Sequence, residues 1–106
     1  MNKYCLLLLV FFVNTGYAAE DVRGQTVGYV YQIDHSNSTA FDINVPGRAN
    51  VCGSTLYRSY SSSDAIANRK FSLVLAAFMS GKEISFHDTG ACEGSRAKIT
   101  WIRITN

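Results

Sequence analysis

The stretch from Ser62 to Asp88, SSDAIANRKFSLVLAAFMSGKEISFHD, places one helix directly before one strand. In its first part, apolar residues recur at spacings of three and four, which is typical of a helix with one buried stripe. Ser62, Ser63 or Asp64 provides the N-terminal cap, and Gly81 is suited to end the helix. The stripe consists of Ala67, Phe71, Val74, Leu75, Phe78 and Met79. We expect this stripe to pack in the core.

Outside the helix, apolar and polar residues alternate, as they do in strands with one buried face. The five strands expected from this pattern are Thr26–Asp34, Phe41–Val45, Thr55–Tyr60, Glu83–Asp88 and Ile99–Thr105. Turn residues between the first two strands predict a hairpin, and a turn is also expected over residues 89–91. In the last strand, alternation places residues 99, 101 and 103 on one face and residues 102 and 104 on the other.

This order of three strands, one helix and two strands predicts a mainly β fold. A five-stranded barrel with the helix between its third and fourth strands is the OB-fold, and closing the barrel removes exposed sheet edges. An open α+β sheet with the helix on one face is the alternative, because the order of the elements does not determine which strands pair.

The first 18 residues predict a secretory signal peptide. Lys3 precedes the apolar run Leu6–Val13, which is too short to span a bilayer, so we expect no membrane insertion. The small residues Gly16 and Ala18 suit cleavage after Ala18. We therefore expect a secreted or periplasmic protein with a single domain over residues 19–106.

Composition and charge argue against several classes of function, namely nucleic-acid binding and most large enzymes. Of the 106 residues, 47% are hydrophobic and 17% are charged, as in a single globular domain. Without residues 1–18, nine Lys or Arg residues remain against eight Asp or Glu residues, and they are scattered along the chain, so no nucleic-acid partner is expected. The domain is also too small for the deep active sites of most large enzyme classes.

Two of the three cysteines remain after cleavage of the signal peptide. An even number of cysteines in a small exported domain favours a disulfide, so we expect the bond Cys52–Cys92. It would close a loop of about 40 residues and stabilise the domain by ~4 kcal/mol. The alternative is a catalytic thiol or a zinc ligand, with His87 as the candidate partner of Cys92.

The C-terminal half of the chain resembles a known toxin-subunit family. The segment Ala76–Asp88, AAFMSGKEISFHD, is followed by Gly90-Ala91-Cys92 and by Lys98–Ile104, KITWIRI. This alanine-rich helix ending in Ser-Gly-Lys, the strand, the cysteine and the final Ile-rich strand resemble B subunits of the subtilase cytotoxin and typhoid toxin type. The resemblance implies an OB-fold subunit that assembles as a homopentamer. It further implies binding to sialylated host glycans and transport of a separate catalytic A chain.

Candidate glycan-binding residues lie on the expected strands and turns. Aromatic rings stack on the apolar faces of sugars, while carboxylate, hydroxyl and cationic groups bind their polar groups. The candidates are Thr26, Asp34, His35, Tyr57, Arg58, Ser59 and Tyr60. Arg58 offers paired donors for a sialic acid carboxylate, and Thr26 offers a hydroxyl where the family's pocket has a Ser. The alternative for each tyrosine is a place in the core or in a subunit interface.

Two other function classes remain open. One is a monomeric periplasmic binding module or inhibitor. The other is a small secreted nuclease in which His35 and His87, beside Asp34 and Asp88, act as base and acid. The sequence contains no nucleophile elbow, phosphate loop or metal-ligand spacing. We therefore expect a non-catalytic, glycan-binding subunit that needs no metal or cofactor.

Overall fold

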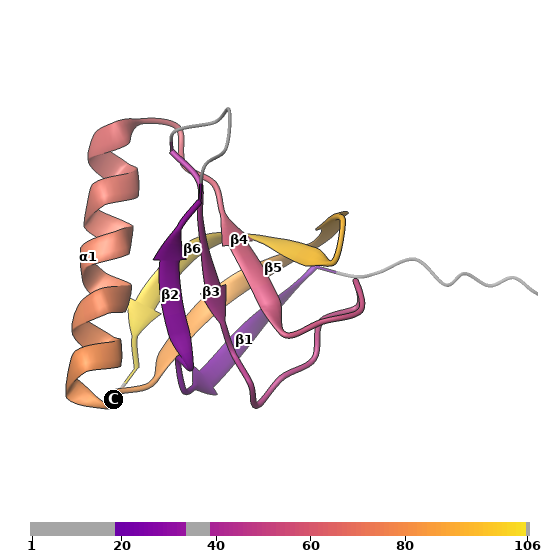
Figure 1. The fold of residues 1–106 in the computed structure, drawn as a ribbon, viewed down its shortest axis with the longest axis horizontal. Coiled ribbons are helices and arrows are strands. Elements are labelled where there is room, and N and C mark those ends of the chain that lie inside the picture. The colour runs from indigo at the N-terminus through magenta and orange to yellow at the C-terminus, as the bar shows by residue number, and fades with distance from the viewer. Residues whose placement is uncertain (1–18, 34–38, 106) are drawn as a thin grey trace, which may run out of the picture.

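The computed structural model describes residues 19–33 and 39–105, and the predicted signal peptide lies outside these ranges. The described residues form six strands and one long helix, whose arrangement is drawn in Figure 1. The elements are β1 (Glu20–Gln25), β2 (Tyr29–Gln32), β3 (Phe41–Asn44), β4 (Leu56–Ser59), α1 (Asp64–Ser80), β5 (Ile84–Glu93) and β6 (Arg96–Ile104). No helix among the described residues is long and apolar enough to cross a membrane.

The six strands form one mixed sheet in the order β1-β5-β6-β4-β3-β2. β4 and β6 are parallel, and each of the other neighbouring pairs is antiparallel. In Figure 1, β2, β3 and β4 run steeply across the direction of β5 and β6, as in a strongly twisted and curled sheet. β1 and β2 are separated in the chain by residues 26–28 alone, yet they occupy the two ends of the sheet order.

The predicted mainly β fold with one helix is confirmed, but the sheet has six strands instead of the expected five. The sequence does not predict β1, because Val22 is its one buried residue and no alternation marks it. Pairing with β5 makes this segment a strand, with Val22 opposite Phe86. The expected first strand, Thr26–Asp34, is shorter in the structure, where β2 pairs with β3 in the predicted hairpin.

The predicted helix and its caps are confirmed. The Ser63 side chain accepts a hydrogen bond from the Ile66 backbone N–H at 3.2 Å, which satisfies one of the free donors of the first turn. Gly81 adopts a left-handed conformation with φ of 72°, and the Lys82 N–H then donates to the Ala77 carbonyl at 2.9 Å. α1 therefore begins and ends where its sequence signals place it.

The last two strands differ from the expected ones. β5 continues to Glu93, through the residues 89–91 that were expected to turn, with Gly90 at a φ of 80° and a register shift beside it. β6 contains a bulge at residues 100 and 101, because two residues separate Ile99 from Ile102 where a single residue of β5 separates their partners. The bulge turns both isoleucines inward, so the prediction that they face opposite ways is wrong.

The core lies between the inner face of the curled sheet and α1. Its largest fully buried side chains include Tyr57, Phe41 and Phe86. The rings of Tyr57 and Phe86 meet edge to face at 5.0 Å, and Phe41 meets Phe71 of the helix at 5.1 Å. The helix packs against β6 and β2, and Figure 1 shows it standing along one side of the sheet.

Part of the predicted helical stripe is not buried. Ala67, Val74 and Ala77 lie against the sheet, whereas Leu75 and Met79 are 41% and 75% exposed. Successive helical residues are about 100° apart, so positions 75 and 79 are turned well away from the line through 67 and 74. The helix therefore presents an exposed apolar flank as well as a buried one.

Candidate functional site

A charged cluster covers the outer face of β2, β3, β4 and β6. Because side chains alternate along each strand, Ile43 and Tyr57 point into the core while their neighbours Asp42 and Arg58 point outward. The strand register places Tyr31 opposite Asp42, Asp42 opposite Arg58 and Arg58 opposite Lys98. With residues of the β5–β6 hairpin, this row forms what we call the Asp42 cluster: Tyr31, Asp42, Arg58, Tyr60, Glu93, Arg96 and Lys98.

Asp42 is the centre of this cluster, and it is completely buried although it lies on the outer face. Its carboxylate accepts from Arg58 Nε at 2.7 Å and Nη2 at 3.0 Å. It also accepts from Arg96 Nε at 2.7 Å and from the Tyr31 hydroxyl at 3.0 Å. Two guanidinium groups therefore cover one carboxylate, and each is held by charge-assisted hydrogen bonds.

These contacts keep the cluster ionised. Burial alone would raise the pKa of Asp42, but hydrogen bonds from Arg58, Arg96 and Tyr31 outweigh it and hold the pKa below its ordinary value of 3.8. The hydrogen bond to Asp42 raises the pKa of the Arg58 guanidinium. A carboxylate with a lowered pKa is a weak base, so Asp42 is suited to holding the two arginines and not to abstracting a proton.

The rim of the cluster is more accessible than its centre. Glu93 lies 3.3 Å from Arg58 Nη1 and accepts a hydrogen bond from the Tyr60 hydroxyl. Lys98 Nζ lies 5.3 Å from the centre of the Tyr60 ring, in a cation–π contact. The Arg96 side chain is 30% exposed and the Glu93 side chain 35% exposed. The rim therefore offers a cation, an acceptor and an aromatic ring to an incoming ligand.

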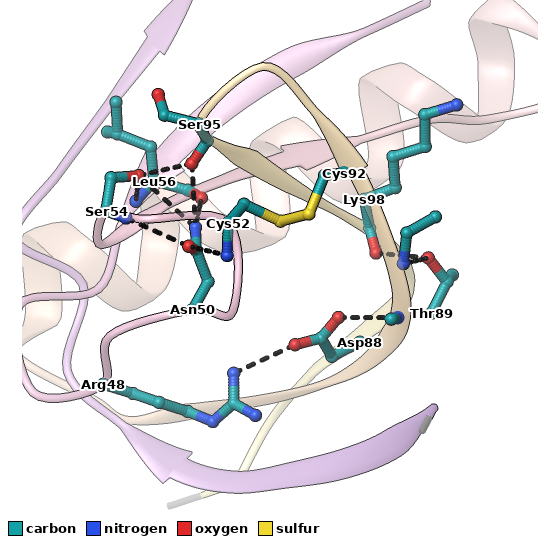
Figure 2. The surroundings of a disulfide bond; sticks show 12 residues. Arg48, Asn50, Cys52, Ser54, Leu56, Asp88, Thr89, Cys92, Ser95 and Lys98 are labelled. Atoms are coloured by element: carbon teal, nitrogen blue, oxygen red, sulfur yellow. Dashed lines mark hydrogen bonds and ion pairs between the residues drawn. A yellow bond between two sulfur atoms is a disulfide. The ribbon is translucent and has the colours of Figure 1, made fainter. Parts of the chain in front are cut away.

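A disulfide-linked loop holds the hairpin that supplies Glu93 and Arg96 (Figure 2). The predicted bond Cys52–Cys92 is confirmed, and it joins the loop between β3 and β4 to the end of β5. Figure 2 shows buried Asn50 beside it, donating to the Leu56 carbonyl at 2.6 Å and the Ser95 carbonyl at 3.1 Å. The loop and the hairpin are therefore fixed to one another by covalent and hydrogen bonds.

The structure brings together two of the predicted glycan-binding residues and separates others. Arg58 and Tyr60 belong to the Asp42 cluster. Tyr57 and Ser59 point inward and are fully buried. Thr26 is exposed and precedes the start of β2. Gln32 at the end of β2 and Ser59 at the end of β4 both pair with Phe41, so Tyr60 lies near the end of β2, away from Thr26. Asp34 and His35 lie outside the described residues.

Tyr57 is instead part of a buried polar group around Arg48. Its hydroxyl accepts from Arg48 Nη1 and donates to the Arg48 carbonyl, both at 2.8 Å. Arg48 also binds Asp88 at 3.0 Å and Glu20 at 3.1 Å. Burial raises the pKa of the Tyr57 hydroxyl. From sequence alone, Tyr57 is a binding candidate and Asp88 a catalytic candidate. In the structure both contact Arg48, which connects β4 and β5 to the loop between β3 and β4 and, through Glu20, to β1.

Five members of the cluster are not among the binding residues predicted from the sequence. They are Tyr31, Asp42, Glu93, Arg96 and Lys98. Asp42 carries a local signal, since it is a polar residue between the apolar Phe41 and Ile43. Its partnership with Arg96, however, spans 54 residues and depends on the register of two strands that are not neighbours in the sheet.

The fold and the site define a small, disulfide-bonded β domain with one helix and a charged outer face. The chain matches the family model described as "Family of unknown function (DUF5992)" over residues 2–105. It belongs to this family. No curated protein matches the chain.

Proposed function

We propose that this chain is an exported, non-catalytic domain that binds acidic glycans through the Asp42 cluster. The observation that carries the proposal is the position of this cluster. It occupies the outer face of β3 and β4 beside the β5–β6 hairpin, and its rim combines aromatic, cationic and acceptor groups. The disulfide supports export, because such bonds persist in oxidising compartments.

The fold class proposed for the domain is the OB-fold. β1 and β2 follow each other in the chain and lie at opposite ends of the sheet order, as the two halves of one bent strand would if that strand closed a barrel. Counted as one strand, they leave five strands with α1 between the third and the fourth. OB-folds bind oligosaccharides and oligonucleotides on the face of strands 2 and 3, which correspond here to β3 and β4.

The chemistry of the rim suits an acidic sugar. The Tyr29 and Tyr31 rings lie 5.9 Å apart on the outer face, and Tyr29 is 46% exposed, so they offer an aromatic surface to a sugar ring. Arg58 is expected from the sequence to hold the acid group, but its guanidinium is already engaged by Asp42 and Glu93. We therefore assign the acid group to Arg96, assisted by Lys98.

The resemblance to toxin B subunits extends this proposal to assembly. A ring of five such domains would present several glycan sites at once and carry a separate A chain. The exposed apolar flank of α1, at Leu75, Phe78 and Met79, supports association, since such a surface is costly in a monomer. The mass of the oxidised protein in solution tests this part, and a stable mass of one chain would favour the monomeric binding module instead.

Glycan binding is tested on an array of sialylated and matched neutral glycans. The oxidised protein is expected to bind the sialylated members, and Arg96→Gln is expected to weaken that binding by at least about tenfold. Arg69→Gln is the matched control, because Arg69 is exposed on α1 and outside the Asp42 cluster. The proposal is wrong if no sialylated glycan binds, or if Arg96→Gln, folded by circular dichroism, binds as well as Arg69→Gln.

A further inference from the structure

The outer face of β1, β5 and β6 carries a second group of polar and aromatic side chains. Asp21 of β1 lies opposite His87 of β5, and the β6 bulge places Trp101 next to His87 on the same face. Arg103 follows two residues later along β6. His87, Trp101 and Arg103 share β5 and β6 with the Asp42 cluster but lie farther from the β5–β6 hairpin than Glu93, Arg96 and Lys98 do, and none of the four residues takes part in the cluster.

Their geometry is well defined. His87 Nδ1 lies 2.8 Å from Asp21 Oδ1, so Nδ1 donates to this carboxylate and Nε2 is the ring nitrogen left for another partner. The His87 and Trp101 rings are nearly parallel, at 27°, with centres 6.4 Å apart. The Arg103 guanidinium carbon lies 5.3 Å from the centre of the Trp101 ring. The four side chains therefore form one continuous surface.

The polar contacts of this surface contribute little to the stability of the fold. Trp101 remains 38% exposed, and the Asp21 side chain is 51% exposed. An exposed ion pair and an exposed cation–π contact are both weak. The β6 bulge nevertheless turns the chain's one tryptophan outward while the isoleucines on either side of it point inward. Bulges often redirect side chains at functional sites.

We propose that Asp21, His87, Trp101 and Arg103 form a second ligand-binding surface, which takes a sugar residue carrying a carboxylate. The indole stacks on the apolar face of the sugar ring. The Arg103 guanidinium turns from the indole to the ligand carboxylate, which it binds through paired donors. His87 Nε2 forms a hydrogen bond with one sugar hydroxyl, and the second oxygen of Asp21 accepts from another.

The single tryptophan provides a direct test. Trp101 fluorescence of the oxidised wild-type protein is followed while methyl glucuronide, methyl glucoside or sodium acetate is added up to millimolar concentrations. The two sugars differ only in the carboxylate, and acetate has the carboxylate without the ring. We expect a saturable change with the glucuronide, at an affinity at least about tenfold higher than for the glucoside, and none with acetate.

Variants separate the contributions of the residues. Arg103→Gln is expected to remove the preference for the glucuronide, and His87→Gln to weaken both sugars. Arg69→Gln serves as the control, and Arg96→Gln of the Asp42 cluster is expected to leave the fluorescence response unchanged. The Trp101 response to a free monosaccharide and its dependence on Arg103, not Arg96, therefore distinguish this result from the outcome of the glycan array. The second surface is excluded if the glucuronide gives no saturable change, if acetate reproduces it, or if Arg103→Gln keeps the preference.

Discussion

Replacing Asp42 by Asn tests whether the charged cluster is held as the structure shows. The substitution keeps the size and shape of the side chain but removes its charge. Arg58 and Arg96 then have no carboxylate at 2.7 Å, and Arg58 is only 8% exposed. Depending on its orientation, the new amide also turns N–H donors toward guanidinium donors. The change therefore removes the carboxylate that the two guanidinium groups share and leaves Arg58 with Glu93, 3.3 Å from its Nη1.

The expected cost follows from the burial of the pair. Removing one partner of a buried ion pair destabilises a protein by about 3–5 kcal/mol. Because the Arg96 side chain is 30% exposed and water reaches it, we take the lower end, about 3 kcal/mol. In a domain of this size, 1 kcal/mol corresponds to about 4–8 °C in melting temperature. Asp42→Asn is thus expected to melt about 12–24 °C below the wild type.

The assay is urea unfolding, followed by Trp101 fluorescence and by circular dichroism. Asp21→Asn is the matched control, since Asp21 is an exposed carboxylate on an outer strand face, and it is expected to change stability by less than about 1 kcal/mol. If Asp42→Asn unfolds within about 1 kcal/mol of the wild type, the arginines are solvated and the proposed geometry of the cluster is refuted.

Acid titration gives a second readout of the same residue. The pKa of Asp42 is below 3.8 in the folded protein, so its carboxylate adds stability above the unfolded-state pKa. This contribution is lost as the pH falls through the folded-state pKa. The wild type is therefore expected to lose stability below about pH 4 more steeply than Asp42→Asn does. Equal slopes for the two proteins would show that Asp42 titrates like a solvated carboxyl.

Three further predictions concern the parts that hold the fold and the hairpin. Replacing both Cys52 and Cys92 by Ser is expected to lower the free energy of unfolding by ~4 kcal/mol, measured in guanidinium chloride; an unchanged midpoint contradicts the role given to the bond. Asn50→Ala removes the side chain that donates to the carbonyls of Leu56 and Ser95 and accepts from the N–H groups of Cys52 and Ser54, and it is expected to cost about 2–3 kcal/mol by urea unfolding. Its control is Asn68→Ala, at an exposed position of α1 where alanine is the better helix former, so no loss of stability is expected there. In Gly81→Ala the added methyl group meets no neighbouring atom, but a φ of 72° is strained for alanine. The free energy of unfolding is expected to fall by about 1 kcal/mol, measured as a lower melting temperature. An unchanged melting temperature would argue against the left-handed cap.

Local features of the sequence predict the elements whose signals lie within a few residues. Ser63 and Gly81 delimit the helix because caps act on backbone groups one turn away. The disulfide is predicted from an even number of cysteines in a domain that is expected to be exported. β1 has no such signal, since Val22 alone is buried in it, and its strand character comes from β5, about 60 residues further along the chain.

The candidate site is harder to predict for the same reason. Arg58 and Tyr60 are found because charged and aromatic residues of the right kind lie close together in the sequence. Ser59 lies between them and points inward, which alternation within β4 explains. Arg96 and Glu93 come from a hairpin whose position is set by the Cys52–Cys92 bond and by the hydrogen bond that Asn50 donates to the Ser95 carbonyl. The alternation of residues within a strand does not indicate which residues of another hairpin lie beside it.

The arginines show how burial changes the role of one residue type. Arg58 has the paired N–H donors that bind a carboxylate, but its Nε and Nη2 already donate to Asp42. A ligand would have to displace this buried carboxylate to reach them. Arg96 is held by the same carboxylate through one edge and remains partly exposed. Arg103 lies over an exposed indole, so releasing it costs only a weak contact. The arginines therefore become more available to a ligand in the order Arg58, Arg96, Arg103. Arg96→Gln is expected to weaken glycan binding at the Asp42 cluster, and Arg103→Gln is expected to weaken it at the second surface.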